Sequence, residues 1–204
     1  MQKLICAGVL LVGALSFGTL AIAQQPAAKK STPVTTDIAI TYSLEHSQVA
    51  QVNGNAFWLN GGSLNGAVTF YKGLGIAANF TGEHASNVSP GVNFGKVAYM
   101  AGPRYTYSIS RYADKSFKNH ATQVFVEFLA GGVHGFDSVF PATSGITTSA
   151  SAFSMQIGGG ADVAIKRGFA MRVLELDFVH TSLPNNAANS QNDFRMGFGI
   201  SYRR

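Results

Sequence analysis

The chain has few charged residues, almost no cysteine, and no long apolar run after residue 23. Only 12% of its 204 residues are charged, whereas 46% are hydrophobic and 11% aromatic. A disordered chain needs high charge and few aromatic residues, and a coiled coil is dominated by Ala, Glu, Lys and Leu, so both classes are excluded. The net charge is +5, but the basic residues are sparse and unclustered, so no nucleic-acid partner is predicted.

The N-terminus has the pattern of an export signal. Lys3 is followed by an apolar stretch over residues 4–20 and by Ala21-Ile22-Ala23, which matches a small-residue cleavage site. We predict a signal peptide at 1–23; the alternative, a single membrane anchor, would need a longer apolar run. Cleavage would remove Cys6, the one cysteine, so an exported chain would contain no disulfide. Residues 24–35 are rich in Pro, Ala and Lys and are predicted to form a flexible leader before a single domain over 36–204.

Beyond the leader, apolar and polar residues alternate with period two, which is typical of β-strands. Eight segments show the pattern, with a slip near Arg172 that indicates a β-bulge. The segments are 37–45, 63–71, 74–83, 96–109, 123–130, 153–163, 174–178 and 193–203.

The connections between these segments also alternate, here in length. Residues 71–73 and 166–168 form short turns that contain glycine, whereas 46–57, 84–93, 135–149 and 181–192 are longer and polar. Short turns at one end and long loops at the other are typical of membrane barrels. Residues 110–120 depart from this scheme, because they form a long basic connection where a short turn is expected. The fold class predicted is all-β, an eight-stranded antiparallel up-and-down transmembrane β-barrel.

Composition of the two strand faces indicates which face is inside. The polar faces hold small residues and a few nearly balanced charges, which suits the narrow lumen of an eight-stranded barrel. The predicted lumen charge network comprises Glu127, Arg104, Lys96, Arg195, Asp162 and Glu175, together with Glu45, Glu83, Asp177 and Arg203. The apolar faces would then contact lipid, with aromatic girdles at Tyr42, Phe70, Phe80, Tyr99, Tyr107, Phe153, Phe178, Phe194 and Tyr202. Alternation alone also fits a soluble sandwich, or a soluble barrel that binds an apolar ligand.

Residues 195–202 carry the most specific motif. The polar Arg195, then Gly197, then Ile200 and Tyr202 at alternate positions match the assembly signal of small eight-stranded outer-membrane barrels. Over residues 36–202 the chain resembles this family, the OmpA- and OmpX-like proteins of Gram-negative bacteria, and departs from it in the two arginines after Tyr202. The resemblance implies insertion by the barrel-assembly machinery, outer-membrane lipid around the barrel, and a non-enzymatic structural role or contact with an extracellular partner through the long loops.

A second motif, His180-Thr181-Ser182, resembles the His-x-Ser pair of the outer-membrane lipid A deacylases. In that family the histidine is the general base for the serine, so His180 and Ser182 are the candidate catalytic residues of an alternative lipid hydrolase. The family's Asn position is occupied by Leu183, and its Glu has no counterpart facing the same side. No cofactor is predicted and no metal site, because the five histidines lack ligand spacing.

Overall fold

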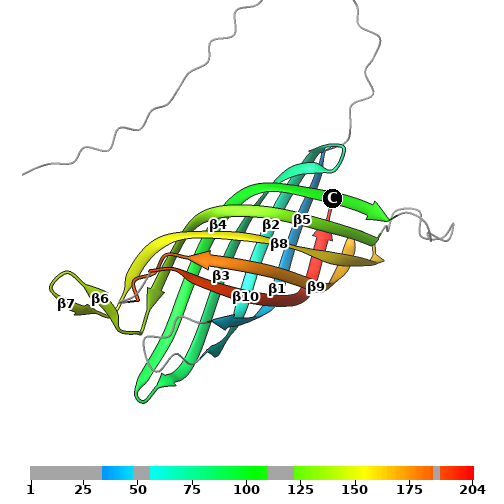
Figure 1. The fold of residues 1–204 in the computed structure, drawn as a ribbon. Coiled ribbons are helices and arrows are strands. Elements are labelled where there is room, and N and C mark those ends of the chain that lie inside the picture. The colour runs from blue at the N-terminus through cyan, green and yellow to red at the C-terminus, as the bar shows by residue number, and fades with distance from the viewer. Residues whose placement is uncertain (1–33, 48–55, 110–121, 186–188) are drawn as a thin grey trace, which may run out of the picture. The chain divides into compact units, whose positions relative to one another are not determined.

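Eight long strands close into a single antiparallel barrel (Figure 1). The computed structural model describes residues 34–47, 56–109, 122–185 and 189–204. The barrel strands are β1 (Thr35–Ser47), β2 (Phe57–Tyr71), β3 (Leu74–Ser89), β4 (Val92–Ile109), β5 (Thr122–Phe136), β8 (Ala150–Lys166), β9 (Phe169–Thr181) and β10 (Gln191–Arg203). Each pairs with its neighbour along the chain, and β1 pairs with β10. The predicted eight-stranded antiparallel up-and-down barrel is confirmed. Within these ranges, no helix is long and apolar enough to span a bilayer.

Side chains alternate between the two faces of the wall as the pattern predicted, with the polar face inward. On β1, Asp37 is 4% exposed while the next residue, Ile38, is 50% exposed. The same inversion holds on all eight strands, and all nine predicted girdle aromatics are at least 41% exposed. A soluble carrier of an apolar ligand has an apolar interior, so this arrangement argues against that alternative.

The strands are staggered around the barrel. One row of paired residues can be followed from Thr35 through Thr69, Gly75, Arg104, Glu127, Gly158, Asp177 and Arg195 to Glu45. The row therefore returns to β1 ten residues beyond its start. A closed barrel with such an offset must have strongly tilted strands.

Two tight turns lie at one end of the barrel, which we call the turn side. Lys72-Gly73 joins β2 to β3, and Arg167-Gly168 joins β8 to β9. All four residues have positive φ, from 45° to 92°, as two-residue hairpin turns require. These turns lie where the sequence predicted them. The opposite end is the loop side.

The loop side has more strand than the sequence indicated. Residues 84–93 were predicted as a long loop, but β3 runs to Ser89 and β4 starts at Val92, leaving only Pro90-Gly91 between them. The prediction was wrong because the alternation of apolar-outward and polar-inward residues stops at His84, so no periodic signal marks the rest of this hairpin. Residues 135–149 include the small hairpin β6 (Phe140–Ala142) and β7 (Gly145–Thr147). β2 begins at Phe57 and β1 at Thr35, the last residue of the predicted leader.

The predicted β-bulge is present on β9. Asp162 of β8 pairs with Arg172, while the preceding Ala161 pairs with Leu174, so Val173 is the extra residue. The predicted signal peptide and the basic connection 110–120 lie outside the described residues.

Candidate functional site

The barrel interior gathers most of the acidic side chains of the protein. The chain has ten Asp and Glu residues. Eight are buried inside the barrel: Asp37, Glu45, Glu83, Glu127, Asp162, Glu175, Asp177 and Asp193. Lys96, Arg104, Arg172 and Arg195 are buried with them, and Arg203 lies at the turn-side edge. Buried charges are stable only when paired and hydrogen-bonded, so the contacts between these groups determine the stability of the interior.

Arg195 donates four hydrogen bonds within this network. Its Nε and Nη2 donate to Asp177 Oδ2 at 3.1 and 3.0 Å, and Nη2 also donates to Gln156 Oε1 at 2.5 Å. Nη1 reaches Thr81 Oγ1 at 3.4 Å on the far wall. Arg195 and Asp177 are direct cross-strand partners, which explains why β9 and β10 present them to each other.

Arg104 and Glu127 are also cross-strand partners, on β4 and β5. Arg104 Nη1 lies 3.8 Å from Glu127 Oε2. Asn65 bridges them more closely, accepting from Arg104 Nη1 at 2.9 Å and donating to Glu127 Oε1 at 3.3 Å. The guanidinium lies over the Phe125 ring, 3.7 Å from its centroid. An aromatic face attracts a guanidinium, so Phe125 supports this arginine inside the polar lumen.

Arg172, at the bulge, joins four groups near the turn side. Its Nε and Nη2 donate to the two carboxylate oxygens of Asp162 at 2.9 and 3.2 Å, a bidentate pair. Nη1 donates to Glu175 Oε2 at 3.2 Å, and Asp37 lies 3.7 Å away. The guanidinium also lies 4.4 Å from the Phe125 centroid. Arg172, which the sequence analysis did not place in the lumen, therefore pairs with three carboxylates there.

Lys96 is the basic centre nearest the loop side. Its Nζ pairs with Glu45, and Glu83 and Asp193 each lie 3.7 Å away. Glu83 has two carboxylate oxygens without a hydrogen-bond partner, and Lys96 is its ion-pair partner. One lysine thus serves three carboxylates at this level.

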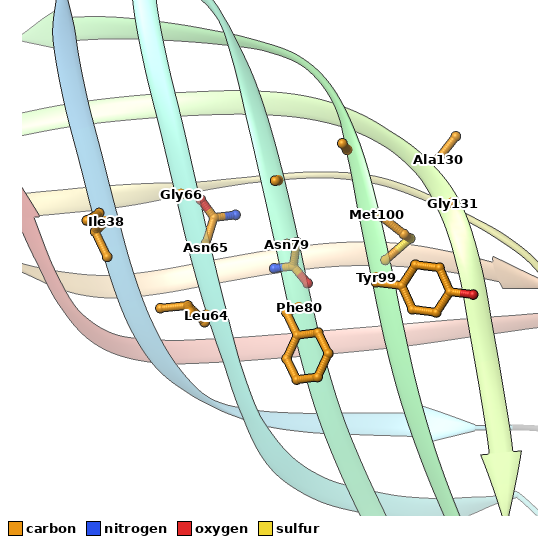
Figure 2. A pocket seen from close by; sticks show the side chains of 12 residues that line it. Ile38, Leu64, Asn65, Gly66, Asn79, Phe80, Tyr99, Met100, Ala130 and Gly131 are labelled. Carbon is orange, nitrogen blue, oxygen red and sulfur yellow. The ribbon is translucent and has the colours of Figure 1, made fainter. Parts of the chain in front are cut away.

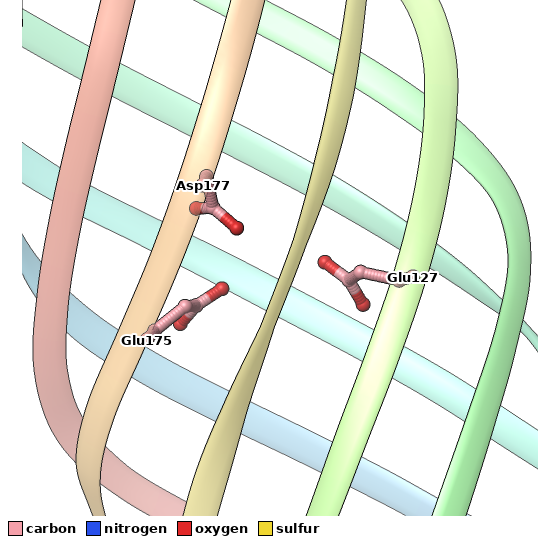
Figure 3. Close-up of side chains that lie close together, drawn as sticks. All are labelled: Glu127, Glu175 and Asp177. Atoms are coloured by element: carbon pink, nitrogen blue, oxygen red, sulfur yellow. The ribbon is translucent and has the colours of Figure 1, made fainter.

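Three carboxylates converge near the middle of the lumen: Glu127, Glu175 and Asp177 (Figure 3). One oxygen from each lies within 4.8 Å of the others, which is a spacing that oxygen ligands of a hard cation adopt. Each also pairs with a different arginine, respectively Arg104, Arg172 and Arg195. The chain itself therefore supplies positive charge to this cluster. The expectation that the protein has no metal site stays a prediction.

Apolar side chains cover the charged lumen on the loop side. Phe94 lies between Phe57 and Phe140, with ring centroids 5.9 and 6.2 Å apart. Together with Leu59, Val133 and Leu183 these residues form the apolar cap, in which all but Phe57 are at most 2% exposed. Phe140 comes from β6 and Leu183 from the segment after β9, so connecting segments fold over the mouth. The cap limits water access to the ion pairs from this side, which strengthens them.

The candidate catalytic residues lie at the loop-side end of β9. His180 Nδ1 is 2.8 Å from Asn192 Oδ1, a carbonyl oxygen that can only accept, so this nitrogen donates. The Ser182 backbone N–H donates to the Phe153 carbonyl at 3.0 Å. Among the described residues, no hydrogen bond joins His180 to Ser182, and the group that orients the histidine is an amide rather than a carboxylate. A nucleophile needs its base within hydrogen-bond reach, so this arrangement is not that of a formed dyad.

On the outside of the barrel, an apolar groove of about 650 Å³ crosses β2 to β5 (Figure 2). Its floor is a row of directly paired small residues, Gly66, Ala78, Ala101 and Ala130. Leu64, Phe80 and Tyr99 form the bank beside it, and are likewise paired with one another across the strands. The groove exists because a row of small side chains runs beside a row of large ones, and its lining suits hydrocarbon.

The residues of the predicted assembly signal occupy β10, the strand that closes the barrel against β1. Arg195 points into the lumen, whereas Ile200 and Tyr202 point outward and are 59% and 41% exposed. Gly197 is an inward position opposite Ser43 of β1. The motif therefore places one charged side chain inside and two apolar ones outside.

Comparison with known proteins places this geometry among small bacterial barrels. Ail, the attachment invasion locus protein of Yersinia pestis, solved with the heparin analogue sucrose octasulfate, superposes with a TM-score of 0.54 at 18% identity over 85% of this chain and 100% of Ail. Neisserial surface protein A superposes with a TM-score of 0.58 at 8% identity over 85% of this chain and 99% of that protein. No family model matches the chain, and no curated protein matches its sequence. The likenesses show the fold, an eight-stranded barrel of the outer-membrane kind.

Some residues that organise the interior were missed by sequence reasoning. Arg172 was set aside because alternation slips at the bulge, although the slip itself was a signal that parity changes there. Phe125 and Leu129 looked like interruptions of a polar face, yet both are buried inside at 3% and 0% exposure. Phe140 and Leu183 of the apolar cap fell in predicted loops, and Phe94 fell between the predicted loop 84–93 and the predicted strand 96–109, so no periodic signal marked these residues as buried.

Proposed function

We propose that the protein is a non-enzymatic integral barrel of the outer membrane of a Gram-negative bacterium, with a structural or surface-interaction role. The observation that carries this proposal is the inverted polarity of the wall. Exposed large apolar side chains cover all eight strands, whereas eight of the ten carboxylates are buried inside. Water would destabilise such a surface, since monomeric soluble proteins rarely expose apolar patches larger than a few hundred Å². Lipid accommodates it.

Export by a cleaved signal peptide at 1–23 and insertion by the barrel-assembly machinery through residues 195–202 belong to the same proposal. The loop-side segments would then face the outside and meet an extracellular partner, and the ion-paired interior under the apolar cap would be a filled lumen rather than a channel.

Cell fractionation combined with gel mobility tests the proposal. The protein is expected in the outer-membrane fraction, and the unboiled sample should migrate faster in detergent electrophoresis than the boiled one, because a folded barrel stays compact. Recovery as a soluble periplasmic protein without a mobility shift would contradict it.

The non-enzymatic assignment is tested with purified barrel in lipid A-containing micelles. We expect no release of fatty acid, because His180 is held by Asn192 and is not bonded to Ser182. Release that disappears in Ser182→Ala would assign the protein to the deacylase-like alternative.

A further inference from the structure

Four histidines form a ring around the outside of the barrel. His46, His84, His134 and His180 lie on β1, β3, β5 and β9, and all four have the parity of the outward face. Toward the turn side, the next outward residues are apolar or glycine: Leu44, Gly82, Gly132 and Phe178. The four positions therefore mark the loop-side edge of the apolar band. We call them the histidine collar.

The strand register shows that the collar is nearly level. His46 pairs with Trp58, and His84 pairs with Asn60. Asn60 lies two residues closer to the turn side than Trp58. His84 pairs with Gly95, and Gly95 pairs with Phe136. His134 lies two residues closer to the turn side than Phe136.

The remaining two steps close the ring. His134 pairs with Ser151, and His180 pairs with Met155. Met155 lies four residues closer to the turn side than Ser151. His180 pairs with Asn192, and His46 pairs with Phe194. Phe194 lies two residues closer to the turn side than Asn192. These four shifts of two, two, four and two residues toward the turn side add up to ten residues. They cancel the ten-residue offset of the paired row around the barrel, so the four histidines differ in height along the barrel axis by only about 5 Å.

The collar has an uncharged setting. The cross-strand partners of the four histidines are Trp58 and Phe194, Asn60 and Gly95, Val97 and Ser151, and Met155 and Asn192. In the described ranges, the basic residues outside the lumen are Lys72, Lys166, Arg167 and Arg204, all at the turn side, and Arg203 is paired with Asp37. The acidic residue outside the lumen in those ranges is Asp137, in the connection after β5. Imidazole protonation is therefore the main way in which the loop-side edge can become positive.

Two of the rings are already oriented for this role. Nδ1 of His180 donates to Asn192 Oδ1, and Nδ1 of His134 lies 2.8 Å from Ser151 Oγ. In His180, Nε2 is then the nitrogen that gains a proton when the ring becomes cationic. In either ring both nitrogens are donors once the ring is cationic.

We propose that the protonated histidine collar binds the anionic phosphate headgroups of the lipids that surround the barrel. This rests on the proposed membrane location, because headgroups lie at the edge of the apolar band only in an inserted barrel. Phosphate oxygens accept hydrogen bonds from cationic rings, and an anionic surface attracts basic groups next to the membrane. The charge of the collar comes from ring protonation, so its preference for anionic lipid should grow as the pH falls.

Trp58, the single tryptophan of the chain, provides an internal probe. It is 53% exposed, and its ring lies 5.0 Å from that of His46 in an edge-on contact. The full-length barrel is folded into phosphatidylcholine vesicles that contain phosphatidylglycerol, with brominated acyl chains on one lipid or the other. Quenching of Trp58 then gives the relative occupancy of the two lipids beside the collar.

From about pH 8 to about pH 5, across the ordinary titration range of histidine, the preference for phosphatidylglycerol should rise on the order of fivefold, the effect of one basic group at an anionic surface. The rise should vanish when all four histidines are replaced by glutamine and persist in the matched control Lys166→Gln/Arg167→Gln at the other rim. A preference that ignores pH, or survives in the four-histidine variant, would overturn the collar.

Two further outcomes separate the underlying assumptions. If inorganic phosphate added to pure phosphatidylcholine vesicles produces the same acid-dependent change in Trp58 emission as phosphatidylglycerol does, the ligand is the free anion and the lipid assignment is wrong. A protein that shows no gel-mobility shift and no quenching by either brominated lipid contradicts the membrane location itself. An inserted barrel without the acid-dependent preference contradicts the collar alone.

Discussion

Individual ion pairs in the lumen combine a charge contact with hydrogen bonds from neutral side chains. The Arg104–Glu127 pair shows this most clearly, because its charged atoms are 3.8 Å apart while Asn65 bonds to both residues. Gln156 also donates to Glu127 Oε1, at 3.4 Å. The neutral amides thus fix the positions of charges that do not touch directly.

Replacing Glu127 by Ala should lower the unfolding midpoint in urea clearly, because it leaves Arg104 buried without its carboxylate. Removing one partner of a buried pair typically costs about 3–5 kcal/mol. Adding Arg104→Ala should recover part of the loss, since the stranded charge is then gone. If the double variant is no more stable than Glu127→Ala, the two side chains do not form a functional pair.

Gly158 of β8 pairs with Glu127 of β5 on one side and with Asp177 of β9 on the other. A Cβ there would lie 1.9 Å from Asp177 Oδ1 and 2.6 Å from the Leu176 carbonyl oxygen. We expect Gly158→Ala to lower the unfolding midpoint by displacing Asp177 from Arg195. Gly66→Ala is the matched control on the lipid face, where a Cβ meets nothing within 4 Å. Equal midpoints for the two variants would contradict this steric role.

Among the strands, β9 shows how one extra residue changes which side chains enter the lumen. Because Val173 is unpaired in the register, both Val173 and Leu174 are exposed, and Arg172 is returned to the inside. Without the bulge, the alternation that puts Glu175 and Asp177 inside would make position 172 face outward.

Deleting Val173 should therefore be tolerated, because it removes the extra residue and places Arg172 two positions before Glu175, on the same inward face. The pairing with β8 and with β10 then runs without a gap, since Leu174 and Arg172 become consecutive. We expect the deletion variant to retain the fast-migrating form in detergent electrophoresis, as Val173→Ala should. Loss of that form in the deletion variant alone would show that the bulge itself is required.

Strand content was predictable from the sequence wherever one face meets a uniform apolar environment. There, Ile38, Ile40 and Tyr42 alternate with inward polar residues and fix both the strand and its orientation. Beyond the apolar band the outward positions His84 and Ser86 are polar, while Ala85 faces inward beside Phe94 of the apolar cap. The alternation of polar-inward and apolar-outward residues therefore stops, and the β3–β4 hairpin was taken for a loop. Most of the individual lumen contacts could not be predicted, because they depend on the stagger between strands, which no single strand encodes.

For the molecule as a whole, the charged lumen and the apolar cap together predict a closed conduction path. Carboxylates and guanidiniums occupy the interior from Asp37 near the turn side to Glu45 near the loop side, and Phe94 and Leu183 lie over it. An eight-stranded barrel has an interior just wide enough for side chains to fill. We expect no steady conductance from the wild-type barrel in planar bilayers. Large, long-lived openings would contradict a filled lumen.

The row of cross-strand pairs that starts at Thr35 and returns to β1 at Glu45, ten residues further on, also bears on how the strands align during assembly. The charged residues along it come from strands far apart in the sequence, and they meet only when every strand has the same stagger. A one-residue slip between any two neighbouring strands would turn a whole strand over, sending charges such as Arg195 or Glu127 to the apolar outer face and apolar side chains into the lumen. Misaligned barrels are thus destabilised at several strands at once, so the buried ion pairs select the correct alignment of the wall.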